Sequence, residues 1–83
     1  MVTCTEDRSG RTTIIEVRTL DRVGVLYRVA AAMAELEIDL VVAKVTTLGH
    51  EAVDAFYVRD TSGVPLDVEH QRELQLAISA ALT

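Results

Sequence analysis

Hydrophobic and polar residues alternate most clearly over residues 12–20. Ile15 and Val17 fall on one face of that segment, and Glu16 and Arg18 fall on the other. Most of its residues are threonine, isoleucine or valine, whose branched side chains pack well on a pleated surface. We therefore expect a strand that buries one of its faces.

A hairpin is expected in the middle of the chain, where a Gly-His-Glu turn separates two strand-like runs. The first run covers 38–48, and the second covers 52–59. Lys44 should point outward from the first run. The residues of that run expected to point inward are Val41, Ala43 and Val45.

Two segments show the three- and four-residue spacing of amphipathic helices. The first follows Asp21, a carboxylate placed to cap exposed amides. Its apolar positions are Val25, Leu26, Val29, Ala30, Met33 and Leu36. The second follows a loop at 60–65 and starts with Asp67 as its cap. Its apolar positions are Leu74, Ala77, Ile78, Ala81 and Leu82.

The order strand, helix, strand, strand, helix predicts an α+β ferredoxin-like fold, an antiparallel sheet with two helices on one face. The usual last strand of that fold does not follow the second helix. We expect a short N-terminal strand at 2–5 to form a hairpin with 12–20, to replace the last strand, and to protect that edge. A single domain over 1–83 is expected, with the N-terminal strand and turn at 1–11 and the core at 12–82.

The composition is that of a folded domain and argues against nucleic-acid and membrane partners. The 83 residues are 49% hydrophobic, which is enough for one folded core. A net charge of −5, one Phe and two Tyr argue against a nucleic-acid partner, which needs clustered cations and stacking rings. No apolar run approaches the roughly 18 residues of a membrane span, and Cys4 stands alone, so no intrachain disulfide is possible. We expect a cytoplasmic protein with no membrane partner and no cofactor.

Two motifs resemble a known family. The first is Ile15-Glu16-Val17 followed by Asp21-Arg22-Val23-Gly24-Val25-Leu26-Tyr27-Arg28, which resembles the ACT-domain signature. The second is Ala43-Lys44-Val45-Thr46-Thr47-Leu48-Gly49 followed by Val53-Asp54-Ala55-Phe56-Tyr57-Val58, which is similar to the C-terminal ACT domains of PII uridylyltransferases. The resemblance covers roughly residues 12–82. The family usually has proline where this chain has Val23, so the junction should be slightly looser here.

The resemblance implies a regulatory, non-catalytic role. PII uridylyltransferases add uridylyl groups to the PII nitrogen-signalling protein and remove them. The resemblance implies that tandem ACT domains read glutamine in these enzymes and bias the catalytic domains. Neither a nucleotidyltransferase nor a metal-dependent hydrolase sequence is present, so the chain looks like a fragment or a stand-alone relative. The implied partners are an amino acid, with glutamine expected, a second ACT domain in a homodimer or tandem, and the catalytic domains of a parent enzyme.

The strand-to-helix junction is the candidate ligand site. The amides of a first helical turn lack intrahelical partners and the dipole adds about half a positive charge, which suits an amino-acid carboxylate. Asp21 would bind the ligand's ammonium group or cap the helix, and Arg22 would clamp an anion or stay solvated. Gly24 would let a ligand approach the backbone or allow tight helix packing. By analogy with ACT pockets between two modules, the neighbour's second strand forms the other wall. The candidate set is Asp21, Arg22, Val23, Gly24, Val25, Leu26, Ala43, Val45 and Thr47.

Alternative functions stay open at this point. A structural assembly module would dimerise through its outer sheet face and bind no small molecule. The residues expected on that face are Ile14, Val42, Val53, Ala55, Tyr57, Glu16, Arg18 and Lys44. An acylphosphatase-like hydrolase would need an asparagine, and the chain contains none. His50 and His70 are expected on the surface without a metal, and Asp54 is expected to be partly buried and paired or capping.

Overall fold

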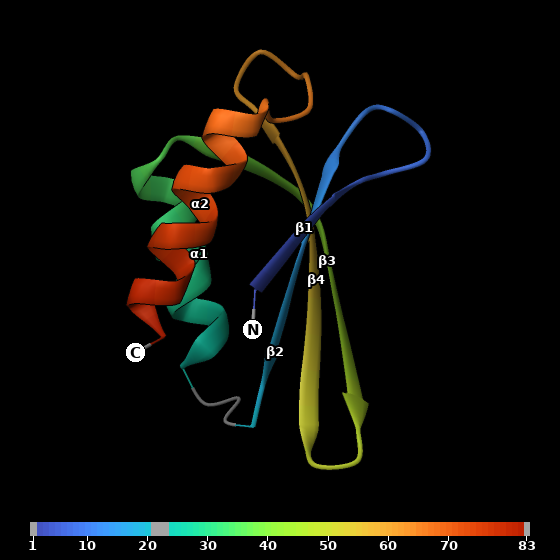
Figure 1. The fold of residues 1–83 in the computed structure, drawn as a ribbon, viewed down its shortest axis with the longest axis vertical. Coiled ribbons are helices and arrows are strands. Elements are labelled where there is room, and N and C mark those ends of the chain that lie inside the picture. Colours follow the sequence, from blue (N-terminus) through green and yellow to red (C-terminus); the bar gives the residue numbers. More distant parts are fainter. Residues whose placement is uncertain (1, 21–23, 83) are drawn as a thin grey trace.

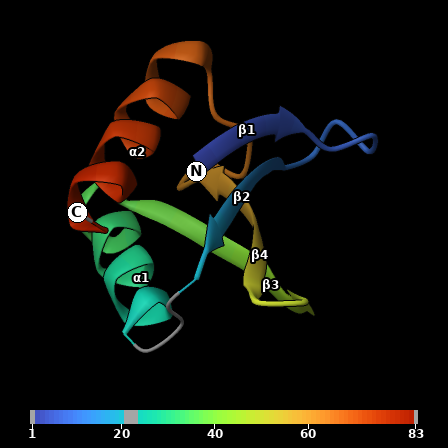
Figure 2. The same cartoon turned by 60° about the horizontal axis from the view of Figure 1, so that its bottom comes forward.

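A four-stranded sheet covered on one side by two helices makes up the computed structural model, which describes residues 2–20 and 24–82 (Figure 1). Figure 2 shows from another angle that both helices lie on the same face. The elements in chain order are β1 (Val2–Glu6), β2 (Thr13–Thr19), α1 (Val25–Glu35), β3 (Ile38–Leu48), β4 (Glu51–Asp60) and α2 (Val68–Ala81). This arrangement confirms the predicted α+β, ferredoxin-like class.

The strands lie in the order β1-β2-β4-β3, and every neighbouring pair is antiparallel. β1 pairs with β2 along its length, so that Cys4 lies opposite Ile15. This edge is the one at which a ferredoxin-like sheet usually carries its last strand, so the predicted replacement by the N-terminal strand is confirmed. Gln75 of α2 holds β1 in place, because its Nε2 donates to the Val2 carbonyl at 2.9 Å.

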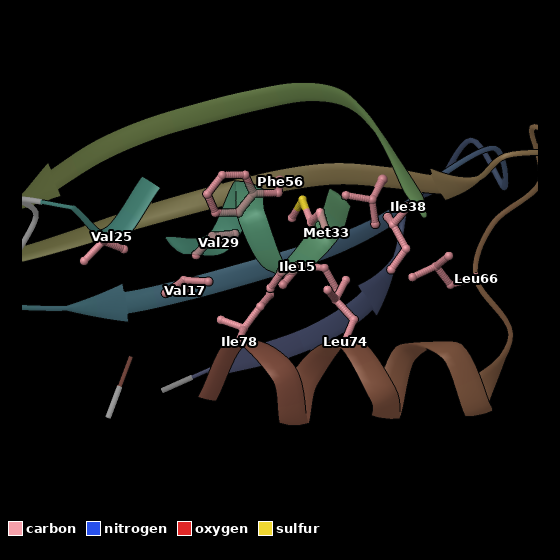
Figure 3. Close-up of a cluster of buried hydrophobic side chains, with 12 residues drawn as sticks. Ile15, Val17, Val25, Val29, Met33, Ile38, Phe56, Leu66, Leu74 and Ile78 are labelled. Carbon is pink, nitrogen blue, oxygen red and sulfur yellow. The ribbon is translucent and has the colours of Figure 1, made fainter. Parts of the chain in front are cut away.

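The hydrophobic core lies between the helices and the sheet face that carries Ile15 and Val17 (Figure 3). Both side chains are fully buried, whereas Arg18 is exposed, as the alternation predicted. Burying an aliphatic side chain of this size contributes roughly 1.5–3 kcal/mol. The remaining core residues are Val25, Val29, Ala32, Met33, Ile38, Phe56, Val58, Leu66, Leu74 and Ile78.

Helix α1 buries a narrower stripe than the sequence predicted. Val25, Val29 and Met33 are buried at helical spacing, but Leu26 is 40% exposed and Ala30 is also exposed. Leu26 and Ala30 each directly follow a buried residue, which places them about 100° further around the helix axis. A helix that packs against a sheet on one side buries only a narrow stripe of its own surface. Leu26 and Ala30 lie outside that stripe and face away from the core.

Helix α2 begins where the sequence predicted. Asp67 is its N-cap residue, and Oδ1 of Asp67 accepts a hydrogen bond from the His70 amide at 2.8 Å. Leu74 and Ile78, one turn apart, are fully buried, and Ala77 packs against the same cluster. The cap and the buried stripe together define this helix.

The β3–β4 hairpin turns through Gly49 and His50, and Gly49 has a φ of 63°, which glycine adopts at no steric cost. A register shift between Leu40 and Val42 marks a bulge at Val41. The prediction that Val41 points inward is wrong. Two consecutive residues face one partner at a bulge, and here Val41 lines the outer face together with Val42.

Ala43 and Val45 lie on the helix-facing side of β3, opposite the buried Phe56 and Asp54. They are not covered, however, and Val45 is 42% exposed. β3 is an edge strand, and among its described side chains only Ile38 is buried. The helix layer therefore leaves most of this edge open.

The outer face of the sheet carries the residues that the sequence assigned to it. Cross-strand pairing places Ile14 opposite Tyr57, Glu16 opposite Ala55, and Tyr57 opposite Val42. Neither helix lies over this face in Figures 1 and 2. It combines apolar and charged side chains that are partly accessible to solvent.

Candidate ligand-binding site

The junction between β2 and α1 has the backbone geometry of an exposed helix start. Gly24 is the N-cap residue, with a φ of 80° in the left-handed region, and its carbonyl accepts from the Arg28 amide at 3.0 Å. The amides of the first turn lie at the positive end of the helix dipole, which favours an anion. The candidates Asp21, Arg22 and Val23 lie outside the described residues.

The next two candidate residues differ in accessibility. The Val25 side chain is 5% exposed and belongs to the core, so only its main chain is available to a ligand. The Leu26 side chain is 40% exposed and leaves the core. Of these two positions, Leu26 is the one whose side chain could contact a ligand.

The β3 candidates share one side of the sheet with the junction. Ala43, Val45 and Thr47 pair with the buried residues of β4, which places them on the helix-facing side, and all three are exposed. Thr47 lies level with Ala52 and Thr19, where β2 ends. The junction and this part of β3 are therefore at the same end of the molecule (Figure 1).

One strand separates the two groups of candidates. β4 lies between β2 and β3, and adjacent strands are about 4.8 Å apart, so β2 and β3 are separated by about 10 Å. A small amino acid bound at the junction would not readily span that distance within one copy of the chain. The sheet order is compatible with a wall supplied by a neighbouring module.

Asp54 is more deeply buried than the sequence suggested. It is fully buried on the helix-facing side of β4, opposite Val17 and Val45. An ionised carboxylate is costly at such a position unless other groups stabilise it. The signal in the sequence was a charged residue at an inward-facing position of an alternating strand.

The remaining titratable candidates behave as surface or structural residues. Burial raises the pKa of the Cys4 thiol, which disfavours the reactive thiolate. His50 and His70 are both exposed, and His70 Nδ1 lies 2.7 Å from Asp67 Oδ1.

Within the part of the chain that the structure describes, no group of three or more His, Cys, Asp or Glu side chains is placed to hold a metal ion. The described helices also include none that is long and apolar enough to cross a bilayer.

Two surface hollows lie away from the junction. One, of about 730 Å³, is beside the end of α1 and is lined by Ala34, Glu37, Ile38, Asp39 and Thr61. The other, of about 420 Å³, lies on the outer face of the sheet. Sequence reasoning found neither of them, because each combines residues from segments far apart in the chain.

Comparison with known proteins identifies relatives over nearly the whole chain. The chain is 40% identical over 77 residues to a bifunctional uridylyltransferase/uridylyl-removing enzyme of Nitrosococcus oceani, which covers 93% of this chain. It is also 40% identical over 82 residues to the enzyme of that name from Bradyrhizobium diazoefficiens, covering 99% of this chain. The chain is homologous to a segment of these enzymes. A third relative with the same name, from Aliivibrio fischeri, is 42% identical over 71 residues, or 86% of this chain.

The similarity to bifunctional uridylyltransferases/uridylyl-removing enzymes confirms the family resemblance drawn from the two motifs. The chain spans only 8–9% of the length of these relatives. No family model and no solved structure matches the chain. The chain therefore corresponds to a small part of a much longer enzyme.

Proposed function

We propose that the chain is a non-catalytic regulatory module of a uridylyltransferase-like enzyme and that it senses an amino acid, with glutamine as the ligand. The observation that carries the proposal is the position of Gly24. It starts α1 in a left-handed conformation at the same end of the sheet as the open, helix-facing side of β3. The small share of the relatives' length that the chain covers supports a regulatory part without catalytic machinery of its own.

The ligand carboxylate would bind the first-turn amides of α1, where the helix dipole favours negative charge. Gly24 would allow close approach, because its lack of a side chain leaves the backbone accessible. The ligand's remaining contacts would come from the side of β3 that carries Val45 and Thr47, supplied by a second module. The free energy by which a bound ligand changes the state of a partner domain is typically about 1–3 kcal/mol.

The second module would pair with the β3 edge. This strand is 11 residues long, and Leu40, Val41, Val42 and Val45 are each more than 40% exposed. Long, apolar edge strands are templates for pairing with another chain unless something covers them. A second copy in a homodimer or a tandem ACT-type module would provide that cover.

Calorimetry with glutamine, performed on monomeric and dimeric protein, tests the proposal. Glutamine should release or absorb heat with the native chain, and Gly24→Ala should weaken binding because alanine is strained at a φ of 80°. Gly63→Ala is a matched control, because Gly63 has a φ of 87° in the loop between β4 and α2. Equal loss in both variants would indicate general destabilisation, and no binding in either oligomeric state would refute the sensing role.

A structural assembly module is the second candidate function. The partly apolar outer face and the open β3 edge both favour association. This alternative predicts a stable dimer whose stability does not change when glutamine or another amino acid is added. Thermal denaturation with and without glutamine separates it from the sensing role, since a ligand that binds the folded state raises the melting temperature.

A further inference from the structure

A hollow on the outer face of the sheet has the composition of an anion-binding site. It has a volume of about 420 Å³ and lies between the β1–β2 turn and the bulge of β3. Figure 1 shows this turn projecting away from the helices, on the same side as the outer face. The residues that line it are Asp7, Ser9, Arg11, Thr12, Val41, Val42, Lys44, Tyr57 and Arg59.

The floor of this outer hollow is apolar and aromatic. The bulge brings Val41 and Val42 to the same side of β3, and each is 44% exposed. Tyr57 lies opposite Val42, and Lys44 Nζ is 4.9 Å from the centre of the Tyr57 ring. The Lys44 ammonium covers part of the Tyr57 ring, so the two valines and the rest of that ring are the surface that a flat or apolar group of a ligand can contact.

Three cations surround that floor and come from three different elements. Arg11 comes from the turn, Lys44 from β3 and Arg59 from β4. Asp39 fixes the orientation of the Arg59 guanidinium, because the Arg59 Nε donates to Asp39 Oδ2 at 2.9 Å. With Asp7 in the lining and Asp39 bound to Arg59, the three cations leave a local excess of one positive charge on a chain whose net charge is −5.

The carboxylate in the lining is engaged within the turn. Asp7 Oδ2 accepts from Ser9 Oγ at 2.8 Å and from Thr12 Oγ1 at 3.0 Å. These hydrogen bonds lower the pKa of Asp7, so the carboxylate stays ionised and keeps the turn in place. The lining therefore combines three cations with one carboxylate that already has local donors, and Asp39 pairs with one of the cations, Arg59.

The size and the surrounding charge favour a small ligand over a polymer. Small-molecule sites typically occupy about 300–1,000 Å³, a range that includes this hollow. A nucleic-acid strand would extend beyond the three cations onto a surface of net negative charge, which would repel it. A ligand with one phosphate group and one flat ring would use the cations and the Tyr57 floor together.

We propose that the outer hollow binds a phosphate-bearing small molecule of mononucleotide size. Arg11 and Arg59 contact the phosphate, for which a guanidinium provides paired donors, and Lys44 adds a third charge. The flat ring of the ligand lies beside the valines of the bulge and contacts the part of Tyr57 that the Lys44 ammonium does not cover. This site is on the opposite face of the sheet from the junction, so none of its residues belongs to the proposed glutamine site.

Nuclear magnetic resonance titration of the 83-residue chain tests this proposal with four probes: uridine 5′-monophosphate, adenosine 5′-monophosphate, uridine and inorganic phosphate. The monophosphates should shift the amide signals of residues 7–12, 41–44 and 57–59, and should bind more tightly than uridine or phosphate alone. Lys44→Gln and Arg11→Gln should each weaken binding by about two- to fivefold, the range for one exposed charge. Tyr57→Leu should reduce the advantage of a nucleotide over phosphate.

Matched controls separate a specific site from general charge attraction. Arg8→Gln changes another exposed arginine of the same turn that does not line the hollow, and Arg72→Gln changes an exposed arginine of α2. Both should bind the monophosphates as tightly as the native chain does. Equal weakening in these controls, or no shift with any probe at millimolar concentration, would overturn the proposal. So would protection of the hollow by a second copy of the chain, seen as concentration-dependent shifts at the same residues without nucleotide.

Discussion

Thr13 Oγ1 accepts a hydrogen bond from the Leu66 amide at 3.0 Å, although the two residues are 53 positions apart in the chain. Thr13 is fully buried at the start of β2, and Leu66 is buried in the segment that leads into α2. The bond therefore connects the sheet to the loop that positions the second helix. A buried amide without a partner is costly, so this single hydroxyl matters for the placement of α2.

Replacing Thr13 by valine should destabilise the fold. The Leu66 amide would stay buried but lose its acceptor, which costs about 1–3 kcal/mol. Urea denaturation followed by circular dichroism measures the change in the free energy of unfolding. Thr13→Ser keeps the hydroxyl and should retain the part of the stability that depends on the bond. Equal stability of Thr13→Val and the native chain would show that the bond contributes nothing.

Removal of the Gln75 amide should loosen the first strand. Gln75→Ala deletes the donor to the Val2 carbonyl and should cost about 1 kcal/mol. Hydrogen exchange of the β1 amides should then accelerate more than exchange in β4. Gln75 and Arg72 are both on α2, so Arg72→Ala serves as a control that should leave β1 exchange unchanged. If β1 exchanges at its native rate in Gln75→Ala, the side chain does not hold the strand.

The β3–β4 turn should require glycine at position 49. Gly49→Ala places a side chain at a φ of 63°, which costs roughly 1–2 kcal/mol for a residue with a Cβ. Gly49→Asn should cost less, because asparagine tolerates this region better. Thermal denaturation of both variants gives the comparison, and His50→Ala is the neighbouring control. A more stable alanine variant than asparagine variant would contradict the assigned turn geometry.

The Asp67–His70 contact at the start of α2 predicts a pH dependence in two parts. The hydrogen bond that the His70 ring donates to Asp67, together with the negative charge of Asp67, raises the pKa of His70. This contribution to stability is complete below about pH 6.5 and is lost as pH rises through the raised pKa. The hydrogen bonds from the His70 amide and side chain lower the pKa of Asp67, so that contribution is present above about 3.9 and is lost as pH falls through the lowered value. The combined contribution is therefore largest between about pH 4 and 6.5.

Titration of the His70 ring by nuclear magnetic resonance checks this pair. The His70 pKa should lie above 6.5 in the native chain and should fall in Asp67→Asn, where the charge is removed. Glu73→Gln should change it much less, because Glu73 is a minor cause of the shift. A His70 pKa that is the same in native chain and Asp67→Asn would show that the contact does not form in solution.

A charge on the helix-facing side of β3 should weaken association with a second module. Val45→Lys places an ammonium group on the open edge, and burying it there should raise the dissociation constant of the dimer about tenfold or more. Val64→Lys is the matched control, because Val64 is 51% exposed in the loop between β4 and α2. Sedimentation equilibrium measures the dissociation constant of the dimer for both variants and for the native chain. A monomeric native chain, or equal effects of the two variants, would count against pairing at β3.

The sequence predicted the helices and strands well because each of them is determined by residues that are close together in the chain. Alternation identified the buried face of β2 through Ile15 and Val17, and a carboxylate followed by a helical stripe located the start of α2 at Asp67. The hairpin expected between the N-terminal segment and β2 correctly predicted the position of β1. These features depend on spacing and residue type, which the sequence displays directly.

The features that the sequence did not predict depend on contacts between distant parts of the chain. The bulge at Val41 inserts one residue into the alternation, and the sequence carries no mark of where the register shifts. The exposure of Leu26 depends on where α1 rests relative to the sheet. The outer hollow joins Arg11 to Lys44 and Arg59, which only the strand order brings together. Of the candidate site, the sequence could indicate the glycine junction and one side of β3, but not their separation by β4.

The N-terminal origin of β1 has a consequence for how fast the sheet can form. β1 and β2 are joined by a short turn, and so are β3 and β4, so two of the three strand pairings close small loops. Only the β2–β4 pairing must bring distant parts of the chain together. A last strand arriving from the far terminus would add a second long-range closure, and folding rates fall as the mean separation of contacting residues rises. This strand arrangement should therefore fold faster than a ferredoxin-like sheet of equal size that is completed by its C-terminus.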